Sequence, residues 1–230
     1  MRRMRLLLFD VDGTLLTCGR QPAQLFGDCL VEVFGTAGDL AGYDFGGKTD
    51  GQIVLELMTA AGLEAGEVRR GLPRMREQYL ARLEAELDRG SMRLMPGVED
   101  TLDRLAGRGE HALALLTGNW EPGARSKLGR FDLNRHFPFG GFGDDGIERH
   151  ELVPAALERA EAATGRRFAP QEALIIGDTV LDVACAKAHG VPVLAVATGR
   201  TSAERLVAAG ADWVAADLIE AAGMLPELAG

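Results

Sequence analysis

Cysteine, histidine and long apolar runs are scarce in this sequence, and each scarcity excludes a class of protein. The three cysteines, Cys18, Cys29 and Cys185, are widely spaced and form no Cys-x-x-Cys pair. This pattern excludes a disulfide framework and a zinc site and indicates reduced thiols, as in a cytoplasmic protein. The four histidines are scattered, which argues against a histidine metal site. No stretch approaches the ~20 apolar residues that a membrane span needs, so we expect no membrane partner.

Positive charge is also in short supply, because 25 lysines and arginines face 34 acidic residues and leave a net charge of -9. This balance argues against nonspecific binding to nucleic acid or to anionic membranes. It does not exclude an anionic substrate, because a bound divalent cation can reverse the local charge. The length of 230 residues and the hydrophobic content of 47% predict a soluble protein with one core and an inserted accessory domain. Monomer and homodimer both stay open.

The stretch Leu6–Thr14 organises the chain. Four apolar residues end abruptly in Asp10 and Asp12, and Gly13 follows. An uninterrupted apolar run is typical of a strand that is buried on both faces in a parallel sheet. The two acids then lie beyond the carboxyl end of that strand, where open α/β sheets bind their ligands. A cation or a shared proton would relieve their repulsion; alternatively, both are solvated aspartates that cap a helix.

Further apolar runs alternate with helical patterns along the rest of the chain. Strands are predicted at residues 112–116, 137–139, 173–176, 191–196 and 212–214, with helices between them. This alternation predicts an α/β fold with a doubly wound parallel sheet of the Rossmann-like kind. We assign residues 1–17 and 94–230 to this core.

Between the first strand and residue 94 the sequence shows helical spacing only. Apolar residues recur at this spacing from Pro22, from Asp50 and over Pro73–Leu87, and a glycine-rich break at 35–51 separates the first two segments. We predict that residues 18–93 form an α-helical cap domain inserted into the core.

Polar triplets also follow two later strands. Thr117-Gly118-Asn119 and Gly177-Asp178-Thr179 each end a buried strand, and Asp182 follows four residues after Asp178. In a parallel sheet these ends lie along one edge with the two acids of the first strand. Four carboxylates, a hydroxyl and several backbone amides suit a divalent cation with a phosphoryl group, and Mg²⁺ prefers such oxygen ligands. Taken singly, the threonine reads as a helix cap and the two later acids as solvated turn residues.

At these residues the sequence resembles the haloacid dehalogenase superfamily. Asp10-Val11-Asp12-Gly13-Thr14, Leu116–Asn119 and Gly177–Asp182 look like its motifs one, two and four, and the helical insert looks like its first-type cap. The likeness covers nearly the whole chain and points to the phosphatase branch, among its phosphoglycolate phosphatase-like members. It implies an Mg²⁺-dependent phosphatase that forms an aspartyl-phosphate intermediate, with a small phosphorylated metabolite as substrate.

The resemblance also implies a role for each site residue. Asp10 would be the nucleophile, Asp12 the general acid and then the general base, and Thr117 the phosphate ligand, with Gly118 and Asn119 beside it. The metal group would be Asp10, Asp12, Asp178 and Asp182, in which Asp182 supports Asp178. Asp12 favours phosphoryl chemistry, because a dehalogenase expels a halide and needs no proton donor at that position.

One motif departs from the family's pattern. The third motif is usually a lysine before the helix that precedes motif four, whereas this sequence has Arg149 there. We assign the role to Arg149, because its permanent charge can bind two oxygens at once. The competing cation, Lys127, is expected to move away from the strand ends along its helix, so that its replacement changes little. In the insert, Lys48 follows a Gly-Gly pair and either meets a substrate anion or lies in a plain loop.

Two other functions stay beside the phosphatase. A sugar-phosphate mutase would use Asp10 and Asp12 in the same way, and a nonenzymatic binding protein could retain the fold. The intact acids argue against the binding protein. Hydrolysis of a generic aryl phosphate with Mg²⁺ and with EDTA separates an enzyme from a binding protein.

Overall fold

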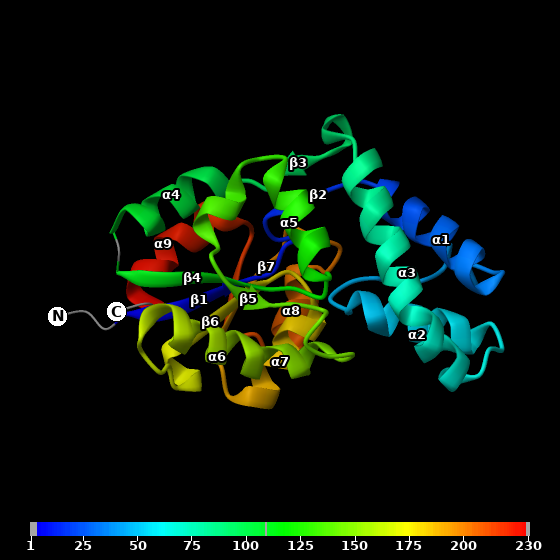
Figure 1. Ribbon diagram of the computed structural model, residues 1–230. Helices are drawn as coiled ribbons and strands as arrows, with labels where there is room; N and C mark the ends of the chain where they lie inside the picture. The colour runs from blue at the N-terminus through cyan, green and yellow to red at the C-terminus, as the bar shows by residue number, and fades with distance from the viewer. Residues whose placement is uncertain (1–3, 109, 229–230) are drawn as a thin grey trace.

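The computed structural model describes residues 4–108 and 110–228, and a six-stranded parallel sheet lies at its centre (Figure 1). Along the sheet the strands follow the order β5 (Gly140–Gly141), β4 (His111–Leu116), β1 (Arg5–Phe9), β6 (Ala173–Gly177), β7 (Val193–Val196) and β8 (Trp213–Ala215). Every neighbouring pair is parallel. The chain therefore has the predicted α/β doubly wound fold. The outer ends of the predicted core, residues 1–3 and 229–230, lie outside the described residues.

Helices cover both faces of the sheet because the strands are apolar on both sides. In β1, Leu7 and Phe9 belong to one buried core, whereas Leu6 and Leu8 belong to the other. The first core includes residues of α4 (Val98–Arg108), α5 (Glu121–Gly129) and α9 (Leu218–Leu228), and the second includes residues of α6 (Leu152–Thr164), α7 (Val180–His189) and α8 (Ala203–Ala208). Within the described residues, no helix has both the length and the apolar character that crossing a membrane demands.

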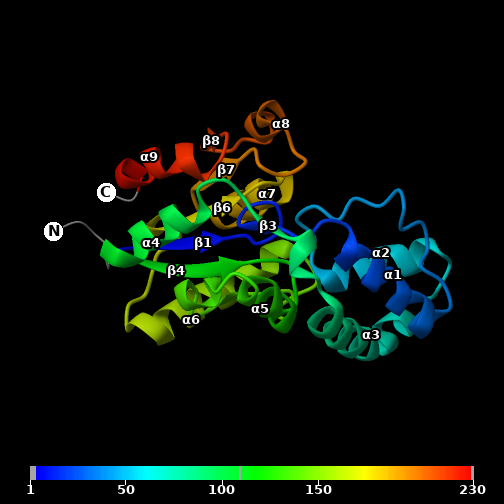
Figure 2. The same cartoon turned by 90° about the horizontal axis from the view of Figure 1, so that it is seen from above.

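The predicted helical insert lies beyond the carboxyl ends of the strands, to the right in Figures 1 and 2. It contains α1 (Gln21–Phe34), α2 (Asp50–Ala60) and α3 (Ala65–Glu86), followed by a short 3-10 turn at Arg89–Ser91. An antiparallel pair, β2 (Leu16–Thr17) with β3 (Arg93–Leu94), stands where the chain leaves the core and returns to it. We keep residues 18–93 as the proposed cap because this strand pair brackets the helices.

The longest helix of the insert begins earlier than predicted. α3 starts at Ala65 and contains Pro73, whereas the sequence pattern indicated a start at the proline. A proline inside a helix leaves the carbonyl four residues earlier without its usual donor. Here that carbonyl belongs to Arg69, which is exposed, so water can satisfy it. The helix therefore continues through the proline.

The third strand is shorter and lies later than the predicted 137–139. β5 consists of Gly140 and Gly141, after a 3-10 turn at Leu133–His136. Phe137 is buried in the core instead and lies against Phe9, with ring centroids 5.7 Å apart. A side chain at position 140 would crowd Leu115 of β4, so glycine permits the close pairing at this end of the sheet.

Candidate active site

Three neighbouring strands end in predicted site residues. Asp10 follows β1, Thr117 follows β4 and Asp178 follows β6. The register aligns these ends, because Phe9 is paired with Ile176 on one side and with the next-to-last residue of β4 on the other. The alignment continues past the strands, since the Asp10 amide donates to the Ile176 carbonyl at 2.9 Å. Residues distant in the sequence therefore share one edge of the sheet.

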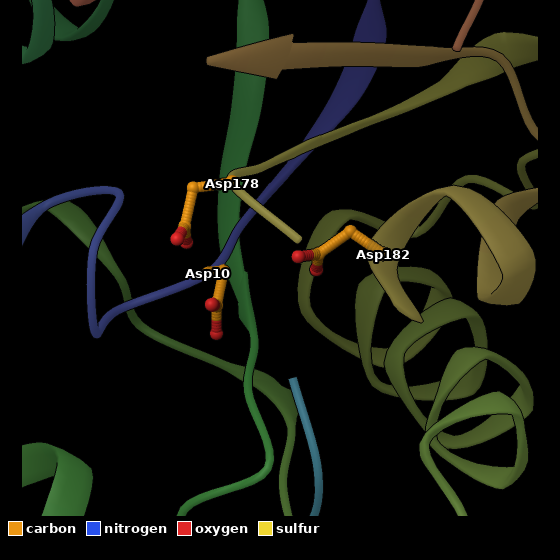
Figure 3. A group of neighbouring side chains, drawn as sticks. All are labelled: Asp10, Asp178 and Asp182. Carbon is orange, nitrogen blue, oxygen red and sulfur yellow. The ribbon is translucent and has the colours of Figure 1, made fainter. Parts of the chain in front are cut away.

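A cluster of three buried acids forms at this edge. Carboxylate oxygens of Asp10, Asp178 and Asp182 lie within 4.8 Å of one another, with Asp182 in the first turn of α7 (Figure 3). Burial raises the pKa of Asp10 to about 6, although the nearby Arg149 lowers it. Burial, together with the charges of Asp10 and Asp182, raises the pKa of Asp178 to about 8. The cluster therefore holds its negative charge poorly unless a cation is bound.

Arg149 is a cation built into this cluster. It lies in a 3-10 turn (Arg149–Glu151) after β5, and its side chain is only 4% exposed. Its Nη2 lies 3.0 Å from Asp10 Oδ1 and also donates to Asp182 Oδ1 and to the Leu116 carbonyl. The structure thus places Arg149 beside Asp10, as expected, and its part in catalysis stays a prediction.

The oxygen donors of the cluster fit a hard divalent cation such as Mg²⁺. Both oxygens of Asp182 are engaged, one by Arg149 and the other by the amide of the residue that caps α7, at 3.0 Å. Asp178 accepts from Thr14 Oγ1 at 3.0 Å through Oδ1, which leaves Oδ2 for an ion. Asp10 and Asp178 could therefore hold such a cation, whereas Asp182 is engaged by Arg149 and by the Thr179 amide.

A second network joins Thr117, Asn119, Asp12 and Lys127. Asn119 donates through Nδ2 to Thr117 Oγ1 and to Asp12 Oδ2, each at 2.8 Å. The Lys127 ammonium lies 2.6 Å from the same Asp12 oxygen and 2.6 Å from Asn119 Oδ1. The Asp12 carboxylate therefore faces these donors and is not among the three clustered acids, although the sequence had placed it in the metal group.

The expectation that Lys127 moves away from the site is wrong. Side chains on a helix tilt toward its N-terminus, and lysine has a long stem, so its ammonium can lie far from its own backbone. The ammonium thereby returns to Asp12, and the residue is buried. The sequence held a signal for this, because Lys127 shares a buried helix face with Ala124 and Leu128.

The insert supplies contacts that sequence reasoning missed. Thr49 caps α2, and its hydroxyl also donates to a backbone carbonyl of the core. The Asp50 amide donates to the Gly118 carbonyl at 2.8 Å, and the Asp50 carboxylate accepts from the Trp120 amide at 2.9 Å. Burial raises the pKa of Asp50 to about 7, against the lowering effect of Lys127. The sequence indicated only that a helix begins near Asp50, because the partner of its carboxylate lies 70 residues away.

Lys48 lines the cavity, but its charge is engaged inside the insert. Its ammonium lies 2.6 Å from Glu56 Oε2 and 3.1 Å from the Tyr43 hydroxyl. Its backbone lies against Gly118, where any side chain would overlap the Lys48 carbonyl oxygen. Contact between Lys48 and a substrate anion stays a prediction, and it requires the ion pair with Glu56 to open.

A cavity of about 480 Å³ lies between the strand ends and the insert. The core contributes Asp10, Asp12, Thr117, Gly118, Asn119, Lys127, Arg149 and Asp178 to its lining, and the insert contributes Phe26, Phe45, Ile53 and Tyr79. The residues at the strand ends are largely polar, whereas the insert contributes these aromatic and aliphatic side chains together with the charged Asp44, Lys48 and Asp50. A cavity of this size and composition suits a small polar molecule.

A sequence profile of the family described as haloacid dehalogenase-like hydrolase matches residues 7–196. The match covers well over half of the chain and includes the ends of β1, β4 and β6. This chain belongs to that family. Membership makes it an enzyme of the hydrolase class and confirms the resemblance carried by Asp10–Thr14 and by the two later motifs.

Two relatives resemble this chain in sequence, and one solved structure resembles it in fold. A phosphoglycolate phosphatase of Mesorhizobium japonicum is 28% identical over 199 residues, which cover 85% of this chain and 84% of that protein. A phosphoglycolate phosphatase of Pseudomonas putida is 28% identical over 197 residues, which cover 85% of this chain and 70% of that protein. The crystal structure of a predicted phosphatase from Clostridium acetobutylicum superimposes with a TM-score of 0.76 at 20% identity, covering 98% of this chain and 99% of that one.

Proposed function

We propose that this hydrolase is a phosphatase that cleaves a small phosphate monoester through an aspartyl-phosphate intermediate. The observation that carries the proposal is the placement of Asp10, a buried carboxylate that lines the cavity together with Asp12, Thr117 and Arg149. A carboxylate nucleophile at this point divides one very slow hydrolysis into two faster steps.

In the first step, a carboxylate oxygen of Asp10 attacks phosphorus, and the bond from phosphorus to the leaving oxygen breaks. Asp12 gives its proton to that leaving oxygen, so an alcohol departs. In the second step, Asp12 takes a proton from water while the water oxygen attacks phosphorus. The acyl phosphate bond then breaks, which releases inorganic phosphate and restores the Asp10 carboxylate.

The phosphoryl group is bound by Thr117 and the amides of Gly118 and Asn119. The Thr117 hydroxyl already accepts a hydrogen bond from Asn119 at 2.8 Å, so its own proton is free for a phosphate oxygen. Arg149 holds Asp10 through Oδ1 at 3.0 Å and offsets the repulsion between this carboxylate and the phosphate. These groups orient the ester before the chemical steps.

The cluster of Asp10, Asp178 and Asp182 supports a dependence on Mg²⁺. Asp10 and Asp178 would hold the ion, with Asp182 fixing their surroundings, and the raised pKa values of the first two suit a site that gains stability when a cation binds. When bound, the ion supplies charge screening between the carboxylate and the phosphate.

The substrate of the proposed reaction is a small phosphorylated metabolite. The names of the two curated relatives support a compound of the phosphoglycolate class, and the cavity of about 480 Å³ has room for it. The cysteines Cys18, Cys29 and Cys185 are free and buried, which supports the prediction that the enzyme works in the reducing cytoplasm.

Replacement of the nucleophile tests the proposal. Asp10→Asn keeps the shape of the side chain, and we expect turnover of p-nitrophenyl phosphate to fall to background, with EDTA having the same effect on the wild type. Acid-quenched wild-type enzyme should carry a phosphoryl group on the peptide that contains Asp10, as read by mass spectrometry. The control is Asp212→Asn, because that carboxylate pairs with Lys187 on the surface and should be dispensable for turnover. Near wild-type turnover in Asp10→Asn contradicts the mechanism.

A further inference from the structure

We infer that Lys127 is a positioning residue that, with Asn119, holds one oxygen of Asp12 so that the other faces the leaving oxygen of the substrate. The inference rests on the proposed function, in which Asp12 protonates that oxygen. Asp12 Oδ2 receives both donors, the Lys127 ammonium at 2.6 Å and Asn119 Nδ2 at 2.8 Å. Within the described residues Oδ1 has no hydrogen-bond partner, and the Asp12 side chain lines the cavity and is 43% exposed.

The burial of Lys127 is hard to explain by stability alone. Its side chain is 5% exposed, whereas the other two lysines, Lys48 and Lys187, lie 21% and 49% exposed in ion pairs. Transfer of an ammonium group out of water costs free energy even when the group is paired. An apolar side chain of similar volume commonly gives an equal or larger free energy of unfolding. A charge in this position, on the otherwise apolar face of α5, therefore has a task in the site.

Lys127 also determines how Asn119 is turned. It binds the Asn119 Oδ1 atom at 2.6 Å, which leaves the Nδ2 group to face Asp12 and Thr117. If the ammonium is removed, the amide can rotate and present its oxygen to the carboxylate, which would repel it. Lys127 thus orients Asp12 twice, once directly and once through Asn119.

Loss of a residue that positions the proton donor should lower kcat more when the leaving oxygen depends more strongly on protonation. A nitrophenolate leaves readily without one, whereas an alkoxide requires protonation as it departs. Loss of Lys127 should therefore lower kcat strongly for alkyl phosphates and weakly for nitrophenyl phosphate. KM should change little, because the phosphoryl group is bound by Thr117 and its neighbouring amides.

The test compares p-nitrophenyl phosphate with p-nitrobenzyl phosphate, which present the same ring but differ in the basicity of the leaving oxygen. For Lys127→Met we expect kcat to fall about 10²-fold on the benzyl ester, the usual value of acid catalysis, and less than about tenfold on the phenyl ester. Lys127→Arg should recover part of the loss on the benzyl ester, because it retains the charge. The matched control is Lys187→Met, whose lysine pairs with Asp212 outside the site and should leave both rates unchanged.

A double-mutant cycle with Asp12→Asn separates positioning from structure. Once Asp12 is replaced, the further change Lys127→Met should have little additional effect on either ester. Provided that the wild type hydrolyses both esters, the inference is overturned if Lys127→Met lowers kcat equally on the two esters. It is also overturned if the effects of Lys127→Met and Asp12→Asn on kcat are fully additive. If Lys127→Met does not fold by circular dichroism, Lys127→Gln keeps a hydrogen-bond donor and should show the same difference between the esters. If instead the wild type hydrolyses neither ester, or Asp10→Asn remains active, the proposed function fails first.

Discussion

Removal of the Arg149 guanidinium should damage both activity and stability, by amounts that depend on pH. In Arg149→Met the buried carboxylates of Asp10 and Asp182 lose the cation that lies between them, 3.0 Å from Asp10 Oδ1. Methionine fills a comparable volume, so the change isolates the charge and its hydrogen bonds. The Leu116 and Gly47 carbonyls, each an acceptor for this side chain, lose their donors as well.

The size of the effect follows from the burial of all three groups. Removing one partner of a buried ion pair typically lowers the free energy of unfolding by about 3–5 kcal/mol, because the other charge is left unpaired. Arg149 lowers the pKa of Asp10, which burial raises to about 6, so without the arginine this pKa rises further. A carboxyl group with a higher pKa in the folded state than its unfolded value of about 4 contributes its full stabilisation below about pH 4. This contribution is lost as the pH rises through the pKa of the folded state. The destabilisation should therefore be larger at pH 8 than at pH 5.

The expected kinetic effect is a loss of about 10²-fold in kcat with Mg²⁺ present, the scale for removing one preorganised electrostatic group. Arg149→Lys should recover part of this loss. A single ammonium restores the charge near Asp10 but cannot reach the two carboxylates and the two carbonyls that the guanidinium now contacts.

Denaturant unfolding at pH 5 and pH 8 in EDTA, together with kcat on an aryl phosphate in Mg²⁺, measures both effects. The control is Arg135→Met, because Arg135 is 44% exposed and pairs with Asp103 and Asp132 on the surface. Such a pair contributes about 0–1 kcal/mol, so the control should be nearly silent. If Arg149→Met stays within about 1 kcal/mol and about threefold of the wild type at both pH values, the reasoning about the buried cation is refuted.

Two other substitutions test how the insert is docked on the core. The pKa of Asp50 is raised to about 7 by burial, so its contribution to stability is present below about pH 4 and lost as pH rises through about 7. Asp50→Asn keeps an acceptor for the Trp120 amide. The Tm of this variant should fall less between pH 5 and pH 8 than the Tm of the wild type. An equal fall would contradict the raised pKa of Asp50. Gly118→Ala adds a methyl group that overlaps the Lys48 carbonyl oxygen, so it should displace the insert, lower kcat/KM and change the X-ray scattering profile. Unchanged kinetics and scattering in that variant would show that the insert does not rest on Gly118.

Local patterns in the sequence were enough to predict the core and the acids at its edge. An apolar run that stops at Asp10 specifies a strand buried on both faces, and alternation with helices specifies a parallel sheet. A parallel sheet in turn places the ends of its strands together, so Thr117 and Asp178 could be assigned to the site without coordinates. Arg149 was predicted because it stands where the family's third motif usually has a lysine, and the structure places it beside Asp10.

Tertiary structure decided which side chains meet once the strand ends are assembled. Lys127 reaches Asp12 because a long side chain can return along its helix, which a count of residues along the axis does not capture. Asp50 meets the Trp120 amide only because the insert closes over the strand ends with a particular orientation, whereas Lys48 meets Glu56 within the insert itself. Sequence periodicity determines which face of an element is buried, whereas partners across elements depend on reach, orientation and burial, and these exist only in the folded chain.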